Sequence, residues 1–209
     1  MQKKEVYMTL VIASVWTVSL TPIILGAVKL MTLMAVPQDV QRIWAVLIRL
    51  VVCGNLASMA FWAAKRLDVE RQIVLRFFSL QGVLIGLLSG GLFIFWESGV
   101  SGFRVSPIEI SSPSILVHVF FIPLVESILW CGVAYTALKR QHSAMIAIVV
   151  SALFFSLSHF GNAPSLFDHE IVLNAFIPGL VLSGVYAATG SLSAPILAHV
   201  LINLHSVMR

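Results

Sequence analysis

The sequence predicts an all-α fold, a polytopic transmembrane bundle of about seven helices. Of its 209 residues, 59% are hydrophobic and only 11% are charged, a composition far from that of a water-soluble domain. The apolar residues also form long runs. Roughly 20 apolar residues in a helix cross the hydrocarbon core of a bilayer while every backbone polar group is satisfied within the segment.

The apolar runs carry local signals that help to place the spans. The first run follows Lys3 and Lys4 and is longer than the apolar part of a signal peptide, so we expect it to be retained. The sixth contains Pro178, whose missing backbone donor predicts a kink, and the last begins with Ser193 and Pro195, which predict a capped first turn. The predicted spans are 6–28, 43–64, 73–96, 114–138, 143–160, 171–189 and a shorter one at 192–207.

Lysine and arginine residues in the short loops fall mainly on one side of the predicted bundle. The positive-inside rule places that side in the cytoplasm, so we expect a cytoplasmic N-terminus and, with an odd number of spans, an external C-terminus. Lys29, Arg42, Arg104 and Arg209 fall on the other side and weaken the bias. The residues on the positive side are Lys3, Lys4, Lys65, Arg66, Arg71, Lys139 and Arg140.

These flanking residues also explain the formal net charge of +4, because the chain has no basic stripe or aromatic platform. We therefore expect the lipid bilayer as its surroundings and no nucleic-acid partner. Cys53 and Cys131 lie in apolar runs without CxxC spacing, which indicates neither a zinc ribbon nor a disulfide framework. The oligomeric state is left open.

Polar residues divide the chain into two parts. Residues 1–112 are predicted to form three spans whose main internal polar residues are Arg49 and Asn55. Residues 113–209 are predicted to form a four-helix core that carries the function. The polar residues of that core are Glu126, His159, His199 and Asn203.

Glu126 is the most informative of these residues, because an ionised carboxyl group inside a bilayer is costly and defaults to a functional role. His199 and Asn203 are spaced i, i+4, so both side chains lie on one face of the last helix. Phe155 and His159 share this spacing, which lets the aromatic ring wall a pocket for the imidazole. The structural alternative is a polar cluster that only fixes helix packing.

The remaining histidines and the serines near the motifs have plainer interpretations. Histidines at the ends of runs are predicted to be interfacial, and serines in the runs to serve helix packing, because they lack the context of a nucleophile. The histidines are His118, His142, His169 and His205, and the serines are Ser127, Ser156 and Ser158.

Three motifs now stand in order along the chain. Glu126 begins E-S-I-L-W-C-G, F-S-L-S-H ends at His159, and G-S-L-S-A-P-I-L-A-H-V-L-I-N runs from Gly190 to Asn203. Over roughly residues 114–207 the sequence resembles the CPBP family of intramembrane proteases. That family includes CAAX-prenyl endopeptidases and bacteriocin-processing and self-immunity proteins, and its signature is EExxxR, then FxxxH, then HxxxN.

The resemblance implies a glutamic-type protease in which Glu126 and His159 activate a water molecule, while His199 and Asn203 stabilise the oxyanion. The implied substrate is a membrane-anchored peptide or protein, such as a prenylated tail, sorting tail or leader. No cofactor is expected; Glu126 with two histidines could hold zinc, but the chain has no HExxH helix, so a metal-free mechanism is favoured. The implied location is a bacterial cytoplasmic membrane.

The first motif departs from the family pattern, because Ser127 replaces its second Glu and Cys131 replaces its Arg. An Arg there would lie about one and a half turns from Glu126 and stabilise its charged form. Two alternatives therefore stay open: a non-catalytic membrane scaffold or bacteriocin self-immunity protein, and haem ligation by His159 and His199.

Straight helices raise a further difficulty, because they would place His159 near the outer face and His199 nearer the inner one. We expect the fifth helix to end within the membrane and residues 161–170 to return into the protein.

Overall fold

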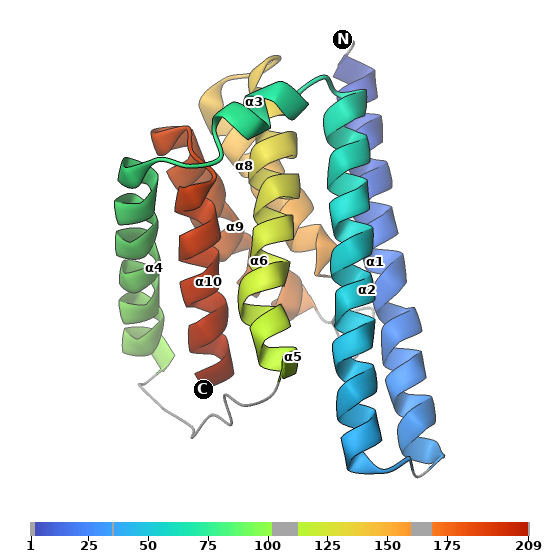
Figure 1. Cartoon of the computed structure of the whole chain (residues 1–209). Coiled ribbons are helices and arrows are strands. Elements are labelled where there is room, and N and C mark those ends of the chain that lie inside the picture. The colour runs from blue at the N-terminus through green and yellow to red at the C-terminus, as the bar shows by residue number, and fades with distance from the viewer. Residues whose placement is uncertain (1–2, 35, 102–112, 160–168, 209) are drawn as a thin grey trace.

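The computed structural model describes residues 3–34, 36–101, 113–159 and 169–208, which form a bundle of helices (Figure 1). No strand occurs among these residues, so the predicted all-α fold is confirmed. The two ends of the chain lie at opposite ends of the bundle. The helices are α1 Lys3–Leu33, α2 Gln38–Arg66, α3 Glu70–Leu75, α4 Leu80–Ser101, α5 Pro113–Leu116, η1 Val117–Phe121, α6 Ile122–Glu126, η2 Ser127–Tyr135, α7 Thr136–Lys139, α8 Ala144–Ser158, α9 His169–Thr189 and α10 Ser193–Met208.

The helices have the length and composition of an integral membrane protein. Within the described residues, three are long and apolar enough to cross a membrane: Gln38–Arg66, Leu80–Gly99 and Val117–Lys139. Three shorter apolar helices accompany them, at Ala144–Ser158, Asn174–Thr189 and Ser193–Met208. The third long helix combines η1, α6, η2 and α7, follows α5 without a break, and is mostly buried inside the bundle.

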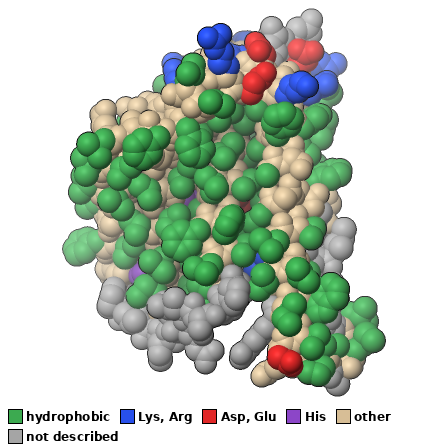
Figure 2. All heavy atoms as spheres, in the orientation of Figure 1, with side chains coloured by type: hydrophobic (Ala, Val, Ile, Leu, Met, Phe, Trp, Pro, Cys, Tyr) green, Lys and Arg blue, Asp and Glu red, His purple; other side chains and the backbone are tan. Residues whose placement is uncertain are grey.

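Charged side chains gather at one end of the molecule. Figure 2 shows most of the Lys, Arg, Asp and Glu side chains of this face at the end where the chain begins, above a surface covered by hydrophobic side chains. The starts of α1 and α8 and the ends of α2 and α7 meet at this end (Figure 1). Membrane proteins commonly concentrate Lys and Arg in the loops on one side of the bilayer, and the charged end of this bundle fits that pattern.

The predicted span 73–96 is wrong in its boundaries. The structure breaks it into α3, which crosses the charged end of the bundle, and α4, which begins only at Leu80 (Figure 1). The backbone between them pairs with the start of α10 instead of continuing a helix. The amide of Leu192 donates to the Arg76 carbonyl at 2.8 Å, and that of Ser193 donates to the Phe77 carbonyl at 3.0 Å.

Glycines bring α4 against α10. A Cβ atom at Gly82 would collide with the Ser193 hydroxyl, and one at Gly86 would lie 2.5 Å from the Ala194 carbonyl oxygen. A Cβ atom at Gly90 would lie 2.9 Å from a methyl carbon of Leu201. Small residues at every fourth position are a common device for close helix packing in membranes. They fix the position of α10, which carries two of the predicted site residues.

Candidate active site

Glu126 lies where the buried central helix changes its winding. Two π-helical segments, η1 and η2, flank the short α6 that ends at Glu126. π-Helical turns are uncommon, and they occur frequently at functional sites because they redirect side chains. Pro123, inside α6, lacks the amide proton that would bond a carbonyl four or five residues earlier.

Glu126 and His199 face each other across the bundle. The Glu126 Oε2 and His199 Nε2 atoms are 3.7 Å apart, and their side chains are 13% and 4% exposed. The other ring nitrogen of His199, Nδ1, is buried and has no hydrogen-bond partner among the described residues. A buried, unsatisfied ring nitrogen beside a buried carboxyl group is costly unless the site receives a ligand or substrate.

His159 reaches the same region through Phe155. The Phe155 ring centroid lies 4.7 Å from that of His159 and 5.5 Å from that of His199. His159 also interacts electrostatically with both Glu126 and His199. Both histidines therefore pack against the same aromatic ring.

The short length of α8 keeps His159 within the depth of the bundle. Its 15 residues extend about 22 Å, less than the roughly 30 Å of a hydrocarbon core, and His159 caps its C-terminal end. The predicted returning segment 161–170 lies outside the described residues, except for His169 and Glu170, which begin α9.

A hydrogen bond defines the tautomer of His159. Its Nδ1 atom lies 2.9 Å from the Phe155 carbonyl oxygen, which can only accept a hydrogen bond. Nδ1 therefore carries the proton, and in the neutral ring Nε2 is left as the basic nitrogen. The arrangement orients His159 for a role as an acceptor of protons.

Asn203 joins α10 to the central helix. Its Nδ2 atom donates a hydrogen bond of 3.1 Å to the His118 carbonyl oxygen. In η1 the amide of Ile122 donates to the carbonyl five residues earlier, that of Val117. In the same pattern the amide of residue 123 would donate to the His118 carbonyl. Because that residue is proline, the side chain of Asn203 supplies the missing donor. One amide proton of Asn203 is thus engaged, and a second remains.

His118 belongs to this region but is not among the residues predicted from the sequence. Its ring interacts electrostatically with those of His159 and His199. His118 stands near the start of its apolar run, where an interfacial position is the ordinary expectation. The position of His118 beside His159 and His199 follows from the packing of α10 against η1, which the sequence does not show.

The two departures from the family's first motif have structural explanations. Cys131 is 2% exposed and its thiol hydrogen-bonds with Ser183 of α9, so this position faces a helix interface rather than the Glu126 carboxyl group. Ser127 is also buried, and its hydroxyl has no hydrogen-bond partner among the described residues.

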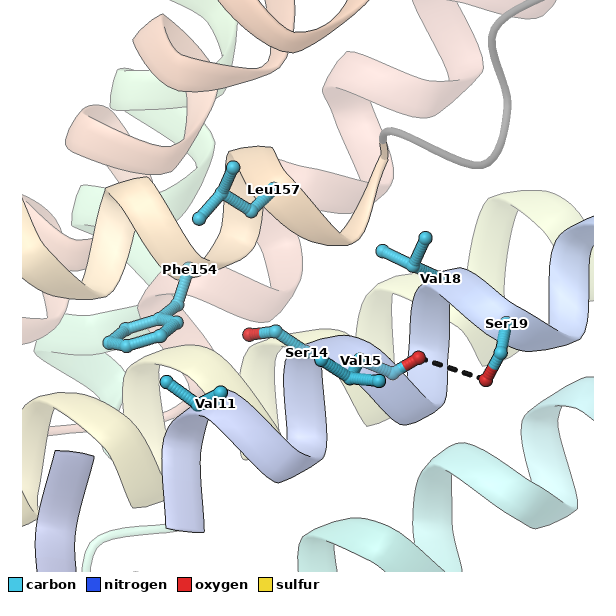
Figure 3. Close-up of a pocket in the computed structure, with 7 residues that line it drawn as sticks. All are labelled: Val11, Ser14, Val15, Val18, Ser19, Phe154 and Leu157. Atoms are coloured by element: carbon cyan, nitrogen blue, oxygen red, sulfur yellow. Dashed lines mark hydrogen bonds between the residues drawn. The ribbon is translucent and has the colours of Figure 1, made fainter. Parts of the chain in front are cut away.

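A separate cavity of about 410 Å³ lies between α1 and α8 (Figure 3). Its walls are Val11, Ser14, Val15, Val18 and Ser19 from α1, with Phe154 and Leu157 from α8.

The cavity has no group suited to catalysis. Its two serine hydroxyls bond to carbonyls of their own helix, that of Ser14 to Leu10 and that of Ser19 to Val15. We therefore place the candidate site in the polar cluster and regard the cavity as a lipid-facing groove.

No group of three His, Cys, Asp or Glu side chains suited to a metal ion occurs within the described ranges. Zinc sites in proteins use three or four such ligands at about 2.0–2.3 Å. The approach of Glu126 to His199 at 3.7 Å gives one acidic and one imidazole ligand.

The candidate site thus combines one carboxyl group and two imidazole rings from three separate helices of an apolar bundle. The family model described as type II CAAX prenyl endopeptidase, Rce1-like, matches residues 109–205. That part of the chain, which contains Glu126, His159, His199, Asn203 and His118, is similar to this family of CAAX prenyl endopeptidases. No curated protein and no solved structure matches the chain.

Proposed function

We propose that the protein is an intramembrane endopeptidase that hydrolyses a peptide bond of a membrane-anchored substrate with a water molecule activated by Glu126. The observation that carries this proposal is the buried pair of Glu126 and His199, 3.7 Å apart, with His159 against the same aromatic ring. The similarity of residues 109–205 to a family of CAAX prenyl endopeptidases supports it.

The proposed reaction needs no covalent intermediate. The ionised Glu126 carboxylate, assisted by Nε2 of His159, takes a proton from water as the water oxygen attacks the peptide carbonyl carbon. The carbonyl oxygen becomes an oxyanion, which accepts hydrogen bonds from His199 and from the second amide proton of Asn203. When the carbon–nitrogen bond breaks, the proton held by Glu126 passes to the leaving amine.

The groups assigned to the oxyanion have unused hydrogen-bonding capacity. His199 has an unpaired Nδ1 atom among the described residues, and Asn203 uses one of its two amide protons on His118. Donors that are already oriented and buried stabilise a developing charge more strongly than donors in water. The burial of this site therefore favours the reaction.

The proposed substrate is a peptide that ends in a prenylated CAAX motif, a cysteine followed by two aliphatic residues and a terminal residue. The family's description supports this substrate class. A lipid-modified cysteine would hold the peptide in the bilayer, where the buried site lies. Sorting tails and leader peptides with an apolar anchor are the second group of substrates to test.

The test is cleavage by the purified protein in lipid nanodiscs. Prenylated CAAX peptides and anchored leader peptides would be incubated with the protein, and the products identified by mass spectrometry. We expect one new carboxyl terminus in at least one probe, formed at the same rate after treatment with EDTA or 1,10-phenanthroline. Loss of cleavage on chelation, restored by zinc, would contradict the metal-free mechanism. Absence of cleavage in every probe would favour the scaffold or immunity alternative.

A further inference from the structure

Arg49 places a permanent positive charge inside the transmembrane helix α2. It lies 11 residues from the start of α2 and 17 from its end, or about 16 Å and 25 Å along the axis. Charged residues at such depths are rare in membrane helices and almost always face a bundle interior or a polar cavity.

The side of α2 that carries Arg49 is the side that faces the candidate site. Arg49 interacts electrostatically with His118, and Cys53, one turn further along α2, interacts with Glu126. α2 packs along α5, η1 and α6, the first part of the central helix. Arg49 therefore stands beside the same stretch of helix that leads to Glu126.

No carboxylate within the described ranges forms an ion pair with Arg49. The two acidic side chains in the described ion pairs lie beside histidines, Glu126 with His199 and Glu97 with His205. Arg49 is half-buried, and a partly desolvated cation is stabilised by an anion that pairs with it. Among the described residues, Arg49 thus has the properties of a group that is available to bind an anion.

The spacing between His118, which interacts with Arg49, and Glu126 suggests which anion Arg49 binds. His118 and Glu126 are eight residues apart on one helix, which corresponds to roughly 10–12 Å along its axis. An extended peptide advances about 3.3 Å per residue, so this distance equals three to four residues. A peptide cut at Glu126 would therefore place its C-terminus beside Arg49 if three or four residues followed the cut.

We propose that Arg49, with His118 beside it, binds the C-terminal carboxylate of the substrate and so sets the number of residues that are removed. This inference rests on the proposed endopeptidase function. A guanidinium group is always charged and matches a carboxylate with two parallel hydrogen bonds. The free carboxylate is the one negative charge that every unmodified C-terminus carries, so the subsite would recognise substrates of different sequence.

The first test compares two forms of one probe on the unaltered protein. A prenylated CAAX peptide would be prepared with a free C-terminal carboxylate and, otherwise identical, as a C-terminal amide. A charge-assisted hydrogen bond in a buried site corresponds to about a 10- to 100-fold effect. We expect kcat/KM for the carboxylate peptide to exceed that for the amide by this factor, and peptides with longer tails to be cut more slowly.

Variants then assign the preference to Arg49. Arg49→Gln should remove both the carboxylate preference and the dependence on tail length, whereas Arg49→Lys should retain part of each. Asn55→Ala is the matched control, because Asn55 lies on the same helix and bonds to the Val51 carbonyl of that helix at 2.8 Å. It should leave both preferences unchanged.

Two results would overturn the proposal: equal rates for carboxylate and amide peptides, or a preference that persists in Arg49→Gln. A phospholipid phosphate bound at Arg49, or an arginine that reaches the membrane surface, predicts the first result. Binding to the Glu126→Gln protein separates this proposal from the function. If no peptide is cut but the carboxylate form binds more tightly in an Arg49-dependent way, the subsite stands and the proposed function fails.

Discussion

Pro123 and Asn203 illustrate how single residues shape the candidate site. Pro123 removes one amide donor from the central helix, and Asn203 of α10 donates to the His118 carbonyl in its place, at 3.1 Å. The bond connects the helix of Glu126 to the helix of His199. Asn203 thus has a structural role in addition to the catalytic role proposed for it.

The two roles of Asn203 can be separated by a double substitution. Asn203→Ala should lower the free energy of unfolding by about 1 kcal/mol, because it leaves the partly buried His118 carbonyl without a donor. Pro123→Ala restores a backbone amide, so the pair Pro123→Ala and Asn203→Ala should recover part of that stability without recovering cleavage. Thermal unfolding in detergent and peptide cleavage would be measured on all four proteins. Recovery of both properties would contradict the oxyanion role.

Cys131 provides a second test at the scale of one residue. The family signature has an arginine at this position, but here the side chain is 2% exposed and hydrogen-bonds with Ser183. Cys131→Arg should therefore destabilise the protein by several kcal/mol, because it buries a charge without a partner. Cys131→Ala, the control, should cost far less. A Cys131→Arg protein with an unchanged melting temperature would show that this position can accept the family residue.

The sequence predicted Glu126, His159, His199 and Asn203 because each is a polar residue inside an apolar run or in a recognisable motif. It did not predict His118, because position within a run indicates depth but not which helix packs beside it. Arg49 was visible as an intramembrane charge, yet its nearness to His118 depends on how α2 lies against η1. Contacts between helices are set by the tertiary fold, which periodicity does not specify.

At the scale of the elements, α4 and α10 form a close helix contact. Gly82, Gly86 and Gly90 remove the side chains that would keep them apart. The break between α3 and α4 belongs to the same contact, since the carbonyls of Arg76 and Phe77 bond to the start of α10. An apolar run predicts a helix but not a tertiary hydrogen bond that ends it, so the predicted span 73–96 was wrong at this point.

Two glycines of α4 form a matched pair for testing this contact. A Cβ at Gly86 would lie 2.5 Å from the Ala194 carbonyl oxygen, whereas one at Gly91 would meet nothing within 4 Å. Gly86→Leu should lower stability by roughly 1–3 kcal/mol or more and displace α10, with loss of cleavage, while Gly91→Leu should be tolerated. Equal melting temperatures for the two variants would contradict the close packing of α4 on α10.

At the scale of the whole molecule, the charged end of the bundle predicts orientation in the membrane. We propose that this end faces the cytoplasm of a bacterial cell, with the C-terminus outside. Cysteines introduced at Asp68, beside the charged end, and at Ser206, near the end of α10, provide reporters, because Cys53 and Cys131 are both buried.

In intact cells a membrane-impermeant maleimide should label the cysteine at position 206 and not that at position 68. The reverse labelling pattern would show the opposite orientation. Labelling of both positions after the cells are lysed is the control for reagent access.

The most direct test of the account as a whole is the cleavage rate of two glutamate variants that differ only in the site they affect. Glu126 lies 3.7 Å from His199, and Glu97 lies at the same distance from His205, so both substitutions to Gln remove a carboxylate beside a histidine. We predict that Glu126→Gln lowers kcat about 10²–10⁴-fold, the usual contribution of a general base, while Glu97→Gln stays within a few-fold of the unaltered protein. Cleavage by folded Glu126→Gln at an unchanged rate would contradict the central claim.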